Sequence, residues 1–176
     1  MRLLLFVGLL ALSLSDTTAA EEEHRELGVH AHGHGTFNIV LDGRILAMEL
    51  QAPGMDIVGF EHAAQTDAQK TAIASARKTL GEPLNVVTLS ASAGCRLESV
   101  NVELHGEHEE NKAHSEFHAE YQLTCAALDK LTEIAFPYFQ QFKQAEELDV
   151  TIIGPHRQQK LEVNRDSATI SLEGFR

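Results

Sequence analysis

The chain has 176 residues and a formal net charge of −12, and it contains two cysteines and ten histidines. The acidic balance argues against nucleic acid and anionic membrane surfaces as partners, and it suits cations. The length is sufficient for one domain with a hydrophobic core.

The first 20 residues have the three parts of a secretory signal peptide. Arg2 supplies a positive start, Leu3 to Leu14 an apolar run, and Ala19 and Ala20 a small-residue cleavage site. The apolar run is shorter than the roughly 20 residues that a spanning helix needs. We expect cleavage, no stable membrane insertion afterwards, and a single domain over residues 21–176. An uncleaved amphipathic anchor is the alternative.

A first hairpin is predicted around Asp42-Gly43, which is typical of a two-residue type I′ turn. This register pairs three sets of residues: Leu41 with Arg44, Ile39 with Leu46, and Phe37 with Met48. Alternate residues of a strand share a side, so the HxHxH spacing places three imidazoles in one row. They are His30, His32 and His34.

The middle of the chain predicts a loop, a helix and a strand. The segment PGMDIVGFEHAAQ reads as an ordered loop whose apolar side chains enter the core. Thr66 and Gln69 fit a capping box for a helix that ends near Leu80, before Gly81 and Pro83. A short strand is expected within 85–89.

A second hairpin is predicted between Cys95 and Cys125. Its apolar residues share one face only if a bulge lies near Glu98–Ser99. The register then pairs Cys95 with Cys125, Val102 with Ala119 and Leu104 with Phe117. The opposite face presents Glu103, His105, Glu116, His118 and Glu120. In an exported chain two cysteines favour a disulfide, of about 3–4 kcal/mol, over thiolate metal ligands.

After Cys125 we expect a second helix with Leu128, Leu131 and Ala135 on its inner side, interrupted at Pro137. A hairpin of 148–153 with 160–164 and a last strand at 168–172 come next. The predicted fold is α+β: antiparallel sheet built from hairpins, with two main helices, in the order ββαββαββ, and one disulfide.

The histidines indicate metal binding. Besides the HxHxH row, four lie in or beside a His-rich loop at 105–118, interleaved with glutamates: His105, His108, His114 and His118. Imidazole and carboxylate suit Zn(II), and also Cu(II), Ni(II) and Co(II). His62 is more typical of a structural histidine than of a ligand. A solvated surface with incidental histidines is the alternative for both clusters.

The sequence does not predict an enzyme. His108-Glu109 lacks the second histidine of an HExxH helix, and no GxSxG elbow, phosphate loop or dinucleotide fingerprint is present. A zinc hydrolase built from scattered ligands is the weaker alternative.

Three stretches carry a resemblance to a known family: HAHGHGTFNIVLDG with LAMELQAPGMDIVGFEHA, GCRLESVNVEL, and HSEFHAEYQLTC. The chain resembles a bacterial family of periplasmic zinc-regulated proteins that serve zinc import. The resemblance implies a periplasmic location, Zn(II) as the ion, and delivery towards an inner-membrane importer. It also implies a functional role for His62.

The sequence leaves three hypotheses for function. The first is a metallochaperone that captures Zn(II) and hands it on. The second is a passive periplasmic metal buffer, which needs no partner. The third is a structural secreted protein whose histidines are incidental.

Overall fold

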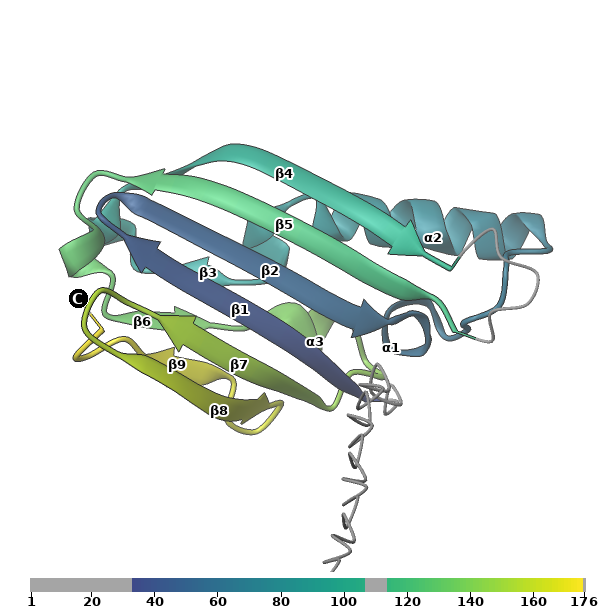
Figure 1. Cartoon of the computed structure of the whole chain (residues 1–176). Helices are drawn as coiled ribbons and strands as arrows, with labels where there is room; N and C mark the ends of the chain where they lie inside the picture. The colour runs from purple at the N-terminus through teal and green to yellow at the C-terminus, as the bar shows by residue number, and fades with distance from the viewer. Residues whose placement is uncertain (1–32, 107–113, 176) are drawn as a thin grey trace, which may run out of the picture.

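The computed structural model describes residues 33–106 and 114–175 (Figure 1). In these ranges the elements are β1 (His34–Asp42), β2 (Ile45–Pro53), α1 (Gly54–Val58), α2 (Asp67–Leu80), η1 (Pro83–Asn85), β3 (Thr88–Leu89), η2 (Ala91–Ala93), β4 (Cys95–His105), β5 (Glu116–Cys125), η3 (Leu128–Lys130), β6 (Glu133–Ala135), α3 (Tyr138–Gln141), β7 (Glu147–Ile153), β8 (Gln158–Asn164) and β9 (Thr169–Ser171). The fold is dominated by sheet, with one long helix. The predicted order ββαββαββ is therefore not what the structure shows.

Two sheets are present in the described ranges. The larger has six strands in the order β4-β5-β2-β1-β7-β8, and the smaller has three in the order β3-β6-β9. All neighbours are antiparallel except β1 and β7, which are parallel. The prediction of a purely antiparallel sheet is wrong at this pair. The long connection between β1 and β7 lets the chain return to the same end before β7 begins.

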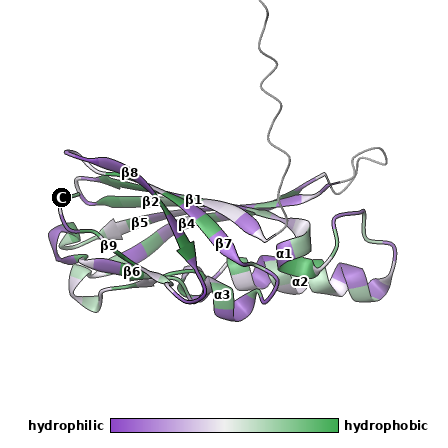
Figure 2. Cartoon of the chain, turned by 90° about the horizontal axis from the view of Figure 1, so that it is seen from below, coloured by the Kyte–Doolittle hydropathy of each residue, from purple (hydrophilic) through white to green (hydrophobic). Residues whose placement is uncertain are grey.

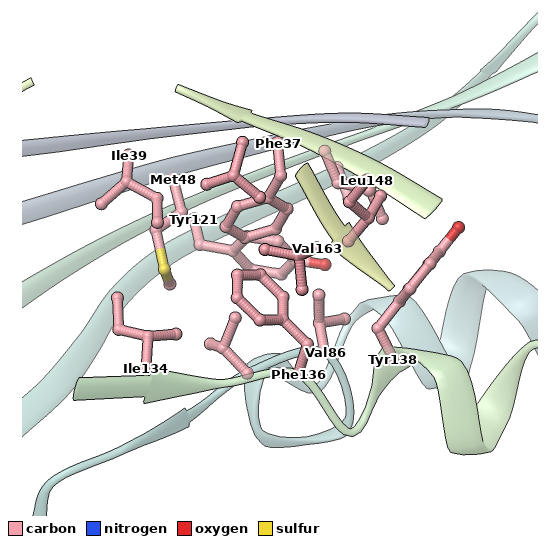
Figure 3. Close-up of a cluster of buried hydrophobic side chains, with 14 of the residues drawn as sticks. Phe37, Ile39, Met48, Val86, Tyr121, Ile134, Phe136, Tyr138, Leu148 and Val163 are labelled. Carbon is pink, nitrogen blue, oxygen red and sulfur yellow. The ribbon is translucent and has the colours of Figure 1, made fainter. Parts of the chain in front are cut away.

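The core lies on one side of the six-stranded sheet. Helices α2 and α3 and the small sheet lie on that side, and the other face of the large sheet is open (Figures 1 and 2). Phe37, Ile39, Met48 and Tyr121 point from the large sheet towards Phe136 and neighbouring apolar side chains (Figure 3). The rings of Phe37 and Phe136 meet edge to face, with centroids 5.3 Å apart. The open face carries mostly polar side chains, with Val40 and Ile153 among its exposed apolar ones.

The first hairpin forms with a register different from the predicted one. Asp42 pairs with Ile45, and the observed partners are Leu41 with Leu46, Ile39 with Met48 and Phe37 with Leu50. The turn residues are Gly43 and Arg44, and only Gly43 has a positive φ, of 58°. A positive φ at the first turn position alone is the type II′ pattern rather than type I′. The shift is two residues, so the same apolar side chains still face the core.

The second hairpin confirms the predicted register. Cys95 pairs with Cys125, Val102 with Ala119 and Leu104 with Phe117, and the register shifts between Leu97 and Ser99 as a bulge. A disulfide joins Cys95 and Cys125 at the base of the hairpin. His105 ends β4 and His118 lies within β5, so these two predicted loop histidines stand on strands.

One predicted helix is present and the other is wrong. Helix α2 begins after Thr66, whose side chain accepts from the Gln69 amide in a capping box. After Cys125 the chain forms the turn η3, the strand β6 and the four-residue helix α3 after Pro137. The residue before proline prefers extended backbone, and β6 pairs with both β3 and β9. Sheet pairing has overridden the helical spacing. None of the described helices is long and apolar enough to cross a membrane.

Candidate metal centre

Of the predicted ligands, His34, His105 and His118 stand on strands at one end of the large sheet, where β1, β5 and β7 begin and β2, β4 and β8 end. One row of partners crosses all six strands on the open face. In strand order the row is Glu103, His118, Gln51, Thr36, Asp149 and Glu162. Neighbouring strands are separated by roughly 4.8 Å. The row therefore places nitrogen and oxygen donors across the whole width of the sheet.

We define the histidine cluster as Glu103, His105, Glu116 and His118, on the paired strands β4 and β5. The rings of His105 and His118 are adjacent, with centroids 4.3 Å apart. His118 Nε2 lies 2.6 Å from a Glu116 carboxylate oxygen, and His105 Nε2 lies 3.2 Å from one of Glu103. This is the shared face that the bulged register predicts. It contains two imidazoles and two carboxylates, which are donor types that zinc accepts, but no three of these residues bring their ligand atoms within 4.8 Å of one another.

His34 lies elsewhere on the same end, beside β7. Its Nδ1 lies 3.2 Å from a Glu147 carboxylate oxygen. Glu147, Asp149 and Glu162 form the one set of three potential ligand atoms within 4.8 Å of one another in the described ranges. Lys160 already pairs with Asp149 at 2.9 Å. An all-oxygen set suits hard cations better than zinc, so His34 is the donor that favours zinc here.

His62 lies in the connection between α1 and α2, and His114 lies at the end of the His-rich loop. His114 Nδ1 contacts the carboxylate of Glu61, which is buried. His62 lies with Nδ1 2.9 Å from the Ala63 carbonyl and Nε2 3.5 Å from the Gln69 amide. Both ring nitrogens of His62 thus already have polar neighbours, one in the segment before α2 and one within α2. Its role as a ligand stays a prediction.

The structure separates the described ligands into groups. His118 and Asp149 stand three strand spacings apart in the row, which is roughly 14 Å. One ion cannot contact both, so the histidine cluster and the acidic set with His34 are distinct. His30, His32 and His108 lie outside the described residues, and their assignment as ligands stays a prediction.

Sequence reasoning missed two buried acids in the segment after β2. Asp56 is 2% exposed and accepts a hydrogen bond of 2.7 Å from the Gly33 amide, between His32 and His34. Burial, followed by the negative charge of Asp56, raises the pKa of the Tyr138 hydroxyl. Glu61 is the second acid. In the sequence, Asp56 and Glu61 flank an apolar run that enters the core, and this pattern could have indicated both acids.

The comparison with family models decides the identity. The model of the ZrgA family zinc uptake protein matches residues 29–172. The chain belongs to the ZrgA family of zinc uptake proteins. This match confirms the resemblance seen in the histidine strand, the VGFEHA segment and the cysteine-closed hairpin. No curated protein matches the chain. The family name describes uptake of zinc.

Proposed function

We propose that this ZrgA family chain captures Zn(II) in the periplasm and passes it towards an inner-membrane zinc importer. The observation that carries the proposal is the histidine cluster. Two imidazoles on paired strands meet at a centroid distance of 4.3 Å, and each has a carboxylate on one ring nitrogen. Paired strands fix both rings before the ion arrives, which lowers the ordering cost of binding.

Further ligands are available at the same end of the sheet. A closed zinc site takes about four ligands. The residues before β1 carry His30 and His32, and the residues between β4 and β5 carry His108. Both segments join the sheet at the end that holds the histidine cluster. We propose that His105 and His118 are the fixed ligands, and that these histidines complete the coordination.

The exposure of the cluster supports delivery to a partner. The side chain of His105 is 55% exposed and that of His118 is 29% exposed. A partner can therefore replace the ligands one at a time, whereas a fully enclosed structural site would have to unfold. The predicted signal peptide and disulfide support the periplasmic location.

A competitive zinc titration of the mature, untagged and oxidised protein tests capture, with metal counted per chain. We expect sub-micromolar binding of about one ion, because two prepositioned imidazoles need only two more donors. Replacing His105 and His118 together with alanine should abolish the tight site. His156→Ala is the matched control, since His156 is exposed in the β7–β8 turn and belongs to neither cluster.

Tight binding that survives in the double variant would overturn the assignment to β4 and β5. Weak binding of several ions by the wild type would instead favour the passive buffer. Delivery is tested by growth of a deletion strain under zinc limitation. We expect a growth defect that the wild-type gene restores and the double variant does not. Normal growth of the deletion strain would count against a role in uptake.

A further inference from the structure

Each described histidine at this end of the sheet contacts one carboxylate, and one of these pairs differs from the rest. The pairs are His34 with Glu147, His105 with Glu103, His118 with Glu116, and His114 with Glu61. The first three carboxylates stand on the sheet surface. The Glu61 side chain is 6% exposed, and 53 residues separate it from His114 in the sequence. The burial of its carboxylate distinguishes the Glu61–His114 contact from the three surface pairs.

The fold fixes Glu61 firmly. Gly59 ends α1 with a φ of 85°, a left-handed conformation that favours glycine, and turns the chain so that Phe60 packs against the core. The Gly54 amide donates to the Ser115 carbonyl at 2.7 Å. A Cβ on Gly54 would collide with the Ser115 side chain. The segment Gly54–Glu61 is thereby held against the residue next to His114.

The contact selects one form of the His114 ring. An ionised carboxylate only accepts hydrogen bonds, so of the two neutral tautomers of the ring it favours the one that carries its proton on Nδ1. Nε2 then keeps its lone pair. The His114 side chain is 59% exposed, which leaves room for an ion to reach the ring. Carboxylates that hold a ligating histidine in this way are general features of zinc sites.

We propose that Glu61 is a positioning residue for zinc: it holds His114 as the Nδ1–H tautomer and presents Nε2 to the ion. This inference rests on the proposed function and adds His114 as an oriented zinc ligand. Asp56, from the same segment, holds the Gly33 amide and so fixes the start of β1. One segment after β2 therefore anchors both histidine-bearing stretches.

A double-mutant cycle tests the proposal through zinc affinity. Glu61→Gln replaces a group that only accepts with a neutral amide that can accept or donate, at nearly constant volume, and we expect it to weaken zinc binding about 10- to 100-fold. In a His114→Ala background the same change should have no further effect, since it acts through that ring. Glu133→Gln, an exposed acid on the small sheet, is the control for the lost charge. Glu61→Asp should restore part of the affinity.

The tautomer of His114 in the metal-free protein gives a second readout, which nitrogen-15 NMR of the imidazoles measures. We expect Nδ1–H in the wild type and loss of that preference in Glu61→Gln. Three results would each overturn the proposal. The first is an unchanged zinc affinity in Glu61→Gln, and the second is an equal loss of affinity in the wild-type and His114→Ala backgrounds. The third is a wild-type His114 that carries its proton on Nε2. A wild type that binds no zinc would refute the proposed function, while the metal-free spectrum would still test the contact with Glu61.

Discussion

Breaking the Cys95–Cys125 bond should lower the free energy of unfolding by about 3.6 kcal/mol. The two cysteines are separated by 30 residues in the sequence. In the chain-entropy model a loop of this length gives about 12 cal/mol/K, which corresponds to about 3.6 kcal/mol at 25 °C. In the folded state β5 pairs with β4 and also with β2, so the backbone register does not depend on the covalent bond. Breaking the disulfide therefore lowers stability by raising the conformational entropy of the unfolded chain.

Urea unfolding of the oxidised and the reduced wild type measures the difference. Reduction is preferable to substitution, because Cys125 is fully buried and an alanine there would add a cavity. We expect the melting temperature to fall by about 7–14 °C. The urea dependence should become steeper, since the reduced unfolded chain exposes more surface. A loss below about 1 kcal/mol would refute the entropy argument for this hairpin.

Three further predictions concern the core, the solvent and the long helix. The Tyr121 hydroxyl donates to the Leu80 carbonyl at 2.8 Å, whereas that of buried Tyr138 has no hydrogen-bond partner among the described residues. In urea unfolding, Tyr121→Phe should therefore cost about 1 kcal/mol, and Tyr138→Phe should add about 1 kcal/mol. Burial raises the pKa of both hydroxyls, so the folded state binds more protons than the unfolded chain above about pH 10. Stability measured by urea should fall there by up to about 1.4 kcal/mol per pH unit for each tyrosine, and the Tyr138→Phe variant should lose less. Thr66→Ala should cost about 1 kcal/mol through the lost helix cap and leave the zinc titration unchanged.

The sequence predicts the second hairpin well because several constraints agree there. The apolar residues on β4 change parity once, and a single bulge is the simplest way to return them to one face. Two cysteines then fix the pairing at the base. The same register predicts the meeting of His105 and His118, since it places them on the polar face of neighbouring strands. Local pattern is sufficient here because the two strands are consecutive in the sequence and both the bulge and the cysteine pair restrict their register.

Prediction fails where distant segments decide the conformation. The spacing of Leu128 and Leu131 fits a helix, but β6 forms between β3 and β9, and neither pairing is visible in the local sequence. The first hairpin is a local failure of a different kind. Its turn lies one residue later than Asp42-Gly43 implies, and the pattern does not distinguish the two registers because both bury the same apolar residues. The parallel pairing of β1 with β7 brings Glu147 to His34, which no local pattern contains.

The separation of the ligands bears on how zinc could leave the protein. A resident structural zinc is held by about four ligands that close around it. Here the described candidate ligands fall into groups on β1, on β4 with β5, and beside the α1–α2 connection, and a carboxylate contacts His34, His105, His114 and His118. In the proposed function, a zinc ion held on the exposed histidine cluster is released by displacing one ligand at a time. We propose that such exposed ligands serve transfer rather than permanent storage, because each step exchanges one nitrogen ligand for a donor of the partner and the ion is never without ligands.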